Sequence, residues 1–188
     1  NTLINNILTT LEAKNYYGID IDFEFILPED KEAFINFISN VKSQLEPAGF
    51  IVMAALAPKT SGEQVGLLYE AHDYPRIGAI VDLALLMTYE WGYMFGSPMA
   101  TSPINAVRRV LDYGVSVIDP NKILMGIPNY AYDWPLPFIQ GETQAEALGN
   151  VEAIVRASEH NVTIQFDEEA MAPFYYYTDE LGVDHVVW

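Results

Sequence analysis

Hydrophobic residues recur along the chain at two alternating spacings. Over residues 2–14 they fall every three or four positions, as on the inner face of a helix, and over residues 18–25 they fall at every second position, as in a strand. Further predicted helices begin near residues 28 and 103 and span 61–72, and further predicted strands span 50–57, 80–89 and 123–130. Strands that are apolar on both faces and alternate with helices predict an α/β fold with a parallel sheet covered by helices.

The pattern changes after Pro137. A helix is expected over 143–159, short strands over 162–166, 174–178 and 184–188, and a hairpin turn over 179–182. We therefore predict two domains, a partial α/β domain over residues 1–137 and a small α+β insertion over residues 138–188. Both ends of the chain fall inside patterned segments, so we expect it to be a piece of a longer protein.

Charge and composition narrow the choice of partner. The 188 residues include 26 acidic and 9 basic side chains, which gives a net charge of −17. Binding to nucleic acid or to an anionic membrane surface needs clustered Lys and Arg, so neither is expected, whereas a neutral sugar is compatible with this charge. The chain has no cysteine, which excludes disulfides and thiolate nucleophiles. No apolar run reaches the ~20 residues of a membrane helix, so no membrane insertion is expected.

Three carboxylates follow the first predicted strand at every second position. Asp20, Asp22 and Glu24 share one face of the stretch GIDIDFEF, while Ile19, Ile21 and Phe23 share the other. Crowded acids raise one another's pKa, and an acid that stays protonated near neutral pH can act as a general acid. A solvated edge strand would also place acids in this way. So would a Mg²⁺ or Mn²⁺ site, which the spacing alone leaves open.

The acidic stretch resembles a family signature. GIDIDFE resembles the strand-4 motif of glycoside hydrolase family 18, the chitinase family, with Tyr17 in place of its first Asp. LLMTYEWG, residues 85–92, resembles the strand-6 segment, with Glu90 where Asp is usual. MGIPNYAYDW, residues 125–134, resembles the strand-7 segment, with Ala131 where Gly is usual. Because the three motifs occur in the right order and spacing, the resemblance covers nearly the whole chain.

This resemblance implies a fold, a substrate class and a location. The chain would form part of a (β/α)8 TIM barrel, strands about four to seven, with the α+β insertion after strand seven. The runs ALAPKTSGEQVGLLYEAHDY and FDEEAMAPFYYYTD resemble the spore branch of the family, the sporulation and germination glycosylases. The expected substrate is then spore cortex peptidoglycan or a chitin-like glycan, and the expected location is the spore envelope or cell wall, outside the cytoplasm. No cofactor and no metal are expected.

The family mechanism assigns four catalytic roles. The resemblance implies that Glu24 protonates the leaving oxygen and then activates water, while the 2-acetamido group of the sugar attacks the anomeric carbon. Asp22 would orient the acetamide and stabilise its positive charge. Asp20 would share a proton with Asp22, and Tyr89 would donate its hydroxyl to the acetamide oxygen.

Five further residues are candidates for substrate binding. Glu90 would hydrogen-bond sugar hydroxyls or the side of Glu24, and Met87 would face the sugar. Tyr130, Trp91 and Trp134 would pack against sugar faces or rims, although plain core packing is an alternative for the two tryptophans.

Two other functions remain open at this point. A catalytically inactive chitinase-like protein could bind sugar on the same barrel, although inactive relatives usually lose the acid that Glu24 retains. A metal-dependent hydrolase could use the three carboxylates. If the chain is an incomplete barrel, we expect it to be a poor catalyst alone and to expose an apolar sheet edge that promotes association.

Overall fold

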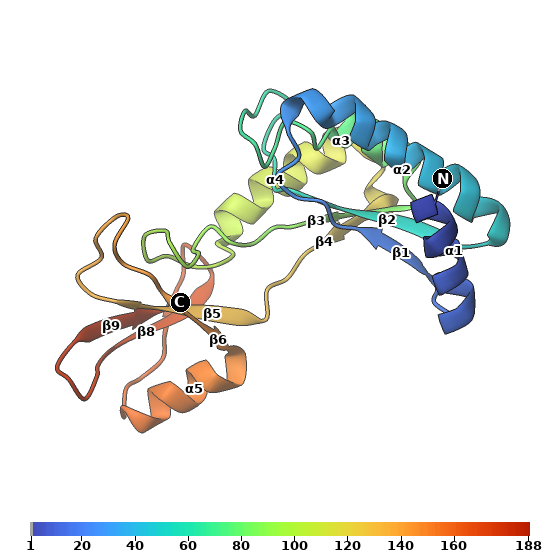
Figure 1. Ribbon diagram of the computed structural model, residues 1–188. Coiled ribbons are helices and arrows are strands. Elements are labelled where there is room, and N and C mark those ends of the chain that lie inside the picture. Colours follow the sequence, from blue (N-terminus) through green and yellow to red (C-terminus); the bar gives the residue numbers. More distant parts are fainter. Residues whose placement is uncertain (1) are drawn as a thin grey trace. The chain divides into compact units, whose positions relative to one another are not determined.

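The protein is described by a computed structural model that covers residues 2–188 (Figure 1). The chain forms two compact units. The first unit comprises the residues up to Met87 together with Arg109–Gly126, and the second comprises Thr88–Arg108 and Ile127–Trp188. The division into a catalytic domain and an insertion at residue 137 stays a prediction.

A four-stranded parallel sheet forms the centre of the first unit. Its strands, in spatial order, are β1 (Gly18–Ile21), β2 (Ile51–Leu56), β3 (Leu83–Leu86) and β4 (Ile123–Met125). Every neighbouring pair is parallel. This arrangement confirms the α/β fold with a parallel sheet, and closure into a barrel stays a prediction.

Helices precede the first strand and connect the others. They are α1 (Thr2–Lys14), α2 (Lys31–Leu45), α3 (Tyr74–Ile80) and α4 (Ile104–Val117), of which residues 109–117 belong to this unit. In Figure 1 helices α2 and α3 lie over one face of the sheet. One stripe of α2 is buried, because its apolar side chains recur at helical spacing: Phe34, Ile35, Ile38, Val41 and Leu45. Among the described residues, no helix combines the length and the hydropathy that a membrane span requires.

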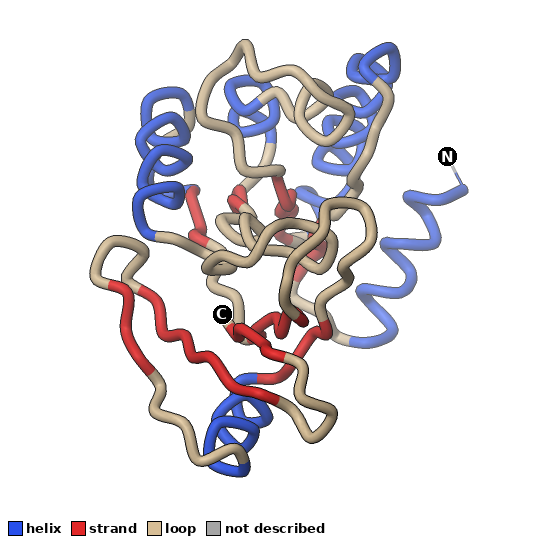
Figure 2. The backbone as a smooth tube through the Cα atoms, turned by 90° about the vertical axis from the view of Figure 1, so that its left-hand side faces the viewer, coloured by secondary structure: helices blue, strands red, loops and turns tan. Residues whose placement is uncertain are grey.

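An antiparallel sheet forms the second unit. Its spatial order is β6 (Glu146–Gly149), β5 (Tyr130–Pro135), β9 (Asp184–Val187), β8 (Ala172–Thr178) and β7 (Gln165–Asp167). Figure 2 shows the strands in red and the helix α5 (Asn150–Glu159) in blue. One face of the sheet packs with α5 around Leu148, Ala157 and Tyr175, and a separate core contains Tyr132, Trp134 and Val186.

Two expected elements of the first unit were wrong. The stretch 61–72 contains turns rather than a helix, because glycines interrupt it and side chains bond to its backbone. Gly66 has φ +127°, and the N–H of Gly66 donates to Glu70 Oε1 at 2.9 Å. The first strand ends at Ile21 instead of residue 25. Phe25 lies at φ 52°, a left-handed conformation that cannot continue a strand.

Two expected elements near the second sheet were also divided differently. The strand expected over 123–130 ends at Met125, and Tyr130 begins β5 instead. The helix expected over 143–159 is β6 followed by α5, because Glu146–Gly149 pairs with β5 and extends the sheet. The predicted hairpin turn is confirmed, since β8 and β9 pair antiparallel and Asp179 Oδ1 accepts the N–H groups of Leu181 and Val183.

Candidate active site

The acidic stretch lies at the carboxyl end of β1. Asp20 belongs to the strand, and Asp22 and Glu24 follow it directly, all three exposed to solvent. Met87 directly follows β3, and its N–H donates to the carbonyl of Leu56 at 3.0 Å. Because the strands are parallel, their carboxyl ends meet at one edge of the sheet. The first unit therefore brings four of the predicted site residues, these three acids and Met87, to the carboxyl-terminal edge of the sheet.

Two apolar residues between the acids contact the rest of the unit, although Phe23 stays 47% exposed. Ile21 is buried in the core, and the ring of Phe23 stacks on Phe34 and Phe37 of α2 at 6.1 and 5.6 Å between centroids. These contacts hold the segment after β1 against α2. The side chains of Asp22 and Glu24 stand on either side of Phe23 in the sequence and remain exposed.

Asp20 shows the electrostatic effect that the acidic stretch predicts. Partial burial of its carboxyl raises its pKa above the usual value of 3.8. The negative charge of Asp22 raises the pKa further, and a hydrogen bond from the backbone of Ala55 opposes the shift. Asp20 therefore holds its proton to higher pH than an isolated aspartate.

His72 fixes this edge and was not predicted to do so. The side chain is only 1% exposed. Its Nδ1 accepts the N–H of Ala57 at 2.7 Å, so Nε2 carries the proton and donates to the carbonyl of Phe23 at 3.0 Å. Burial lowers the pKa of His72, which keeps the ring neutral. The buried amine of Lys59 donates to the carbonyl of His72 at 3.2 Å.

Glu90 is the centre of a polar cluster in the second unit. Its Oε1 accepts the hydroxyl of Tyr130 at 3.2 Å and the hydroxyl of Tyr132 at 3.0 Å. Burial and the hydrogen bond to Glu90 raise the pKa of Tyr132 to about 12, and burial and the Glu90 charge raise that of Tyr130. Both hydroxyls therefore stay protonated and act as donors. Glu90 itself has φ 65°, which is unusual for a residue with a side chain.

Aromatic side chains surround this cluster. The ring of Tyr89 meets Tyr130 edge to face, with centroids 6.5 Å apart. Trp91 is half-buried, and its backbone N–H donates to the carbonyl of Thr101 at 3.1 Å. Trp134 is fully buried, and its indole N–H donates to the carbonyl of Gly96 at 2.8 Å. Trp134 is thus a core side chain, which was the alternative to sugar packing.

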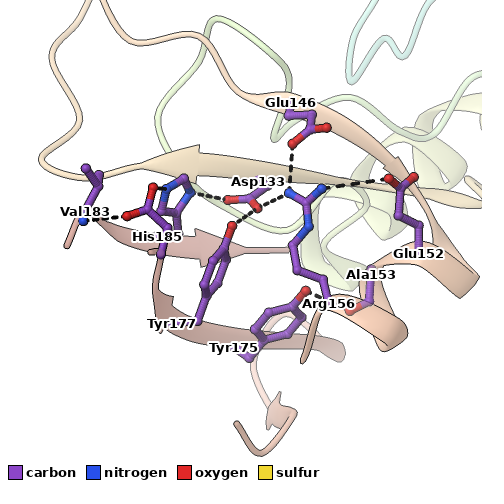
Figure 3. Close-up of polar contacts among 10 residues, drawn as sticks. Asp133, Glu146, Glu152, Ala153, Arg156, Tyr175, Tyr177, Val183 and His185 are labelled. Atoms are coloured by element: carbon purple, nitrogen blue, oxygen red, sulfur yellow. Dashed lines mark hydrogen bonds and ion pairs between the residues drawn. The ribbon is translucent and has the colours of Figure 1, made fainter. Parts of the chain in front are cut away.

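The opposite face of β5 carries an ion network that sequence reasoning missed (Figure 3). Asp133 is 1% exposed and accepts hydrogen bonds from Arg156 at 2.5 Å, Tyr177 at 2.6 Å and His185 at 2.8 Å. Arg156 also pairs with the exposed Glu146 at 2.8 Å. Within residues 2–188, no group of three or more Asp, Glu or His side chains is arranged to hold a metal ion.

The comparison with known proteins now decides the family. The family model described as "Glycosyl hydrolases family 18" matches residues 1–188. The chain belongs to glycosyl hydrolase family 18. It is 46% identical over 188 residues to the cortical fragment-lytic enzyme of Bacillus anthracis, a match that covers 100% of this chain and 44% of that enzyme.

Solved structures agree with this family 18 assignment. The crystal structure of the Bacillus cereus spore cortex-lytic enzyme SleL has a TM-score of 0.93 and 48% identity, over 98% of this chain and 42% of that chain. A chitinase from Chromobacterium violaceum is similar in fold, with a TM-score of 0.89 at 22% identity, over 98% of this chain and 57% of that chain. This family 18 chain spans less than half the length of the two Bacillus enzymes named above.

Proposed function

We propose that this chain is part of a retaining glycoside hydrolase that cleaves β-1,4 bonds in glycans containing N-acetylglucosamine. Family membership supports hydrolysis of a glycosidic bond. The names of the Bacillus relatives, a cortical fragment-lytic enzyme and a spore cortex-lytic enzyme, favour cortex peptidoglycan over a chitin-like glycan. The proposed location is accordingly the spore envelope or cell wall, outside the cytoplasm.

The observation that carries the proposal is the placement of the acidic stretch. Asp20, Asp22 and Glu24 lie at the carboxyl edge of a parallel sheet, which is where the active sites of α/β barrels are built. Glu24 is the last of the three acids and is exposed. Phe23, beside it in the sequence, is fixed by α2 and His72, and this support limits how far the neighbouring side chains can move.

The proposed mechanism uses the acetamido group of the substrate as the nucleophile. Glu24 gives its proton to the leaving oxygen while the acetamide oxygen attacks the anomeric carbon, so that an oxazolinium ion forms. Asp22 accepts a hydrogen bond from the acetamide N–H and stabilises the positive charge. Asp20, whose pKa is raised, shares a proton with Asp22. Glu24 then takes a proton from a water molecule whose oxygen attacks the anomeric carbon. The oxazolinium ring opens, and the anomeric carbon keeps its original configuration.

Residues of the second unit supply contacts to the sugar in this proposal. Tyr89 donates its hydroxyl to the acetamide oxygen, and Glu90 accepts hydrogen bonds from sugar hydroxyls. Tyr130 and Trp91, which are both half-buried, present ring surface for packing against a pyranose. Met87, which belongs to the first unit and follows β3, supplies an apolar contact.

The decisive experiment replaces Glu24 in the full-length protein. Glu24→Gln keeps the shape of the side chain and removes its acid function, so turnover of a chromogenic N-acetylglucosamine glycoside and release of reducing ends from purified cortex peptidoglycan should fall at least about 10²-fold. Binding of an N-acetylglucosamine oligomer should be retained. For the wild-type protein, NMR of the first-formed product should show the β-anomer.

A matched control separates this effect from a change of charge. Glu29→Gln alters an exposed glutamate in the short helical turn Pro28–Asp30 and should leave turnover unchanged. Unchanged turnover in Glu24→Gln would overturn the assignment of the acid. Oligomer binding by a wild-type protein that hydrolyses nothing would instead favour an inactive chitinase-like sugar-binding protein.

A further inference from the structure

We propose that Tyr132 is a positioning residue, which together with Tyr130 orients the carboxylate of Glu90 so that its Oε2 receives a hydrogen bond from a glycan hydroxyl. The inference rests on the proposed function and extends it to a residue to which the sequence assigned no role. It is carried by the geometry of the second unit alone.

The hydrogen bonds define the orientation of Glu90. Both tyrosine hydroxyls donate to the same oxygen, Oε1, at 3.0 and 3.2 Å. A tyrosine hydroxyl has one proton to donate, so each hydroxyl commits its proton to this carboxylate. Two donors on one oxygen fix the rotation of the carboxyl group, and Oε2 takes part in neither bond. The side chain of Glu90 is exposed, so this second oxygen can accept a proton donor from a ligand.

Tyr132 differs from Tyr130 in its surroundings. Tyr132 is only 6% exposed, whereas Tyr130 is half-buried and can itself touch a ligand. The ring of Tyr132 packs between Tyr130 and Trp134, with centroids 5.7 Å from each. Its backbone exchanges two hydrogen bonds with Trp188, at 2.9 and 3.0 Å. Tyr132 is therefore a rigid donor that acts on a ligand only through Glu90.

Fixing Glu90 has a chemical purpose. A carboxylate without such support rotates freely, and a ligand hydroxyl must then order it at an entropic cost on binding. The oriented carboxylate is already ordered in the free protein, so it accepts the hydrogen bond without this entropy loss on binding. Such a contact is present in both the ground state and the transition state, so its loss raises KM and leaves kcat nearly unchanged.

The test is a double-mutant cycle in the full-length protein. Tyr132→Phe, Glu90→Ala and the double variant are compared for KM and kcat, and their affinities for an N-acetylglucosamine tetramer are measured by calorimetry in a Glu24→Gln background. Tyr132→Phe should raise KM and Kd about tenfold, with kcat within about twofold of wild type. In the Glu90→Ala background the same change should add almost nothing.

Tyr175→Phe is the matched control. Tyr175 is a buried tyrosine of the same unit, and its hydroxyl donates to the carbonyl of Ala153 at 2.7 Å, away from Glu90. This variant also loses one buried hydrogen bond, yet its KM should match that of wild type. A spectroscopic readout accompanies the kinetics: the ¹³Cζ resonance of Tyr132 at pH 7, assigned by its loss in Tyr132→Phe, should move in Glu90→Gln and stay in place in Tyr175→Phe.

The outcomes separate this inference from the proposed function. Additive effects of Tyr132→Phe and Glu90→Ala, or an equal rise of KM in Tyr175→Phe, would overturn the role of Tyr132. An inactive wild type would overturn the proposed function, while the cycle of affinities would still decide the inference. Absence of any tetramer binding would overturn both.

Discussion

The imidazole of His72 lies 3.0 Å from the carbonyl oxygen of Phe23 and donates its Nε2 proton to it. The other ring nitrogen accepts the N–H of Ala57 at 2.7 Å. One neutral side chain thus joins the backbone just after β1 to the backbone just after β2. The joined segment contains the acidic stretch, so the position of Asp22 and Glu24 depends on a residue 50 positions away in the loop between β2 and β3.

Replacing His72 by Phe should destabilise the protein while preserving the stacking of the ring against Phe34. The buried N–H of Ala57 and the carbonyl of Phe23 would both lose their partner, which costs about 2–3 kcal/mol of the free energy of unfolding. Urea denaturation of the full-length protein at pH 7.5 measures this loss. Glu32→Gln, which breaks the exposed ion pair with Arg76, is the control and should leave the midpoint nearly unchanged.

The effect of His72 should also depend on pH. Its folded pKa lies below 6.5, so the unfolded chain takes up the proton first as the pH falls. The stability that the neutral ring provides is complete above pH 6.5 and is lost as the pH falls from there through the folded pKa. The difference between wild type and His72→Phe should therefore shrink below pH 6.5, and a constant difference down to pH 4.5 would contradict a neutral His72.

Asp20→Asn should stabilise the protein at neutral pH. The folded pKa of Asp20 is raised above 3.8, so its contribution to stability falls as the pH rises from about 3.8 through the folded pKa. Asn keeps an acceptor for the backbone of Ala55 and carries no charge, so Tm at pH 7 should rise by about 2 °C, with little change at pH 3. Thermal melting at the two pH values checks this, and a lower Tm at pH 7 would show that ionised Asp20 stabilises the fold.

In the ion network on β5, Arg156 pairs with one buried and one exposed carboxylate, so the two ion pairs can be compared by mutation. Asp133→Asn removes the buried partner of Arg156 and should cost about 3 kcal/mol, because a partly buried guanidinium loses its counter-charge. Glu146→Gln removes the partner whose side chain is 60% exposed and should cost less than about 1 kcal/mol. Chemical denaturation of both variants tests this order, and equal losses would mean that burial does not set the strength of the network.

Gly92 should tolerate no side chain. A Cβ at this position would lie 2.0 Å from the carbonyl oxygen of Met99, so Gly92→Ala must displace the segment that begins at Glu90. We expect a loss of about 2 kcal/mol or more and a higher KM in the full-length protein. Gly149→Ala, where a Cβ meets nothing within 4 Å, is the matched control and should behave as wild type.

The sequence predicted the elements whose pattern is local. The apolar stripe of α2, the alternation around Asp20 and the turn before Gly182 each depend on neighbours in the chain, and each is present in the structure. The helix expected over 61–72 failed because side chains such as Glu70 bond to the backbone of their own segment, an option that apolar spacing does not show.

The supporting residues of the site were beyond sequence reasoning. His72 acts on Phe23, 49 positions away, and Tyr132 acts on Glu90, 42 positions away. No spacing rule connects such pairs, because the fold alone brings them together. The only available signal was that both lie in segments that carried the family resemblance, 55–74 and 125–134. Asp133 was missed because a strand expected to end at residue 130 left it in a loop.

The alternation of side chains along β5 makes the strand sensitive to an insertion. Its odd-numbered residue Asp133 faces Arg156 of α5, and its even-numbered residue Tyr132 faces Glu90. Inserting one amino acid ahead of Tyr130 would exchange these two sides along the strand. The ring of Tyr132 would then meet the guanidinium and Ala131 would replace Tyr132 beside Glu90, so a single codon would undo both the ion pair with α5 and the support of the Glu90 carboxylate.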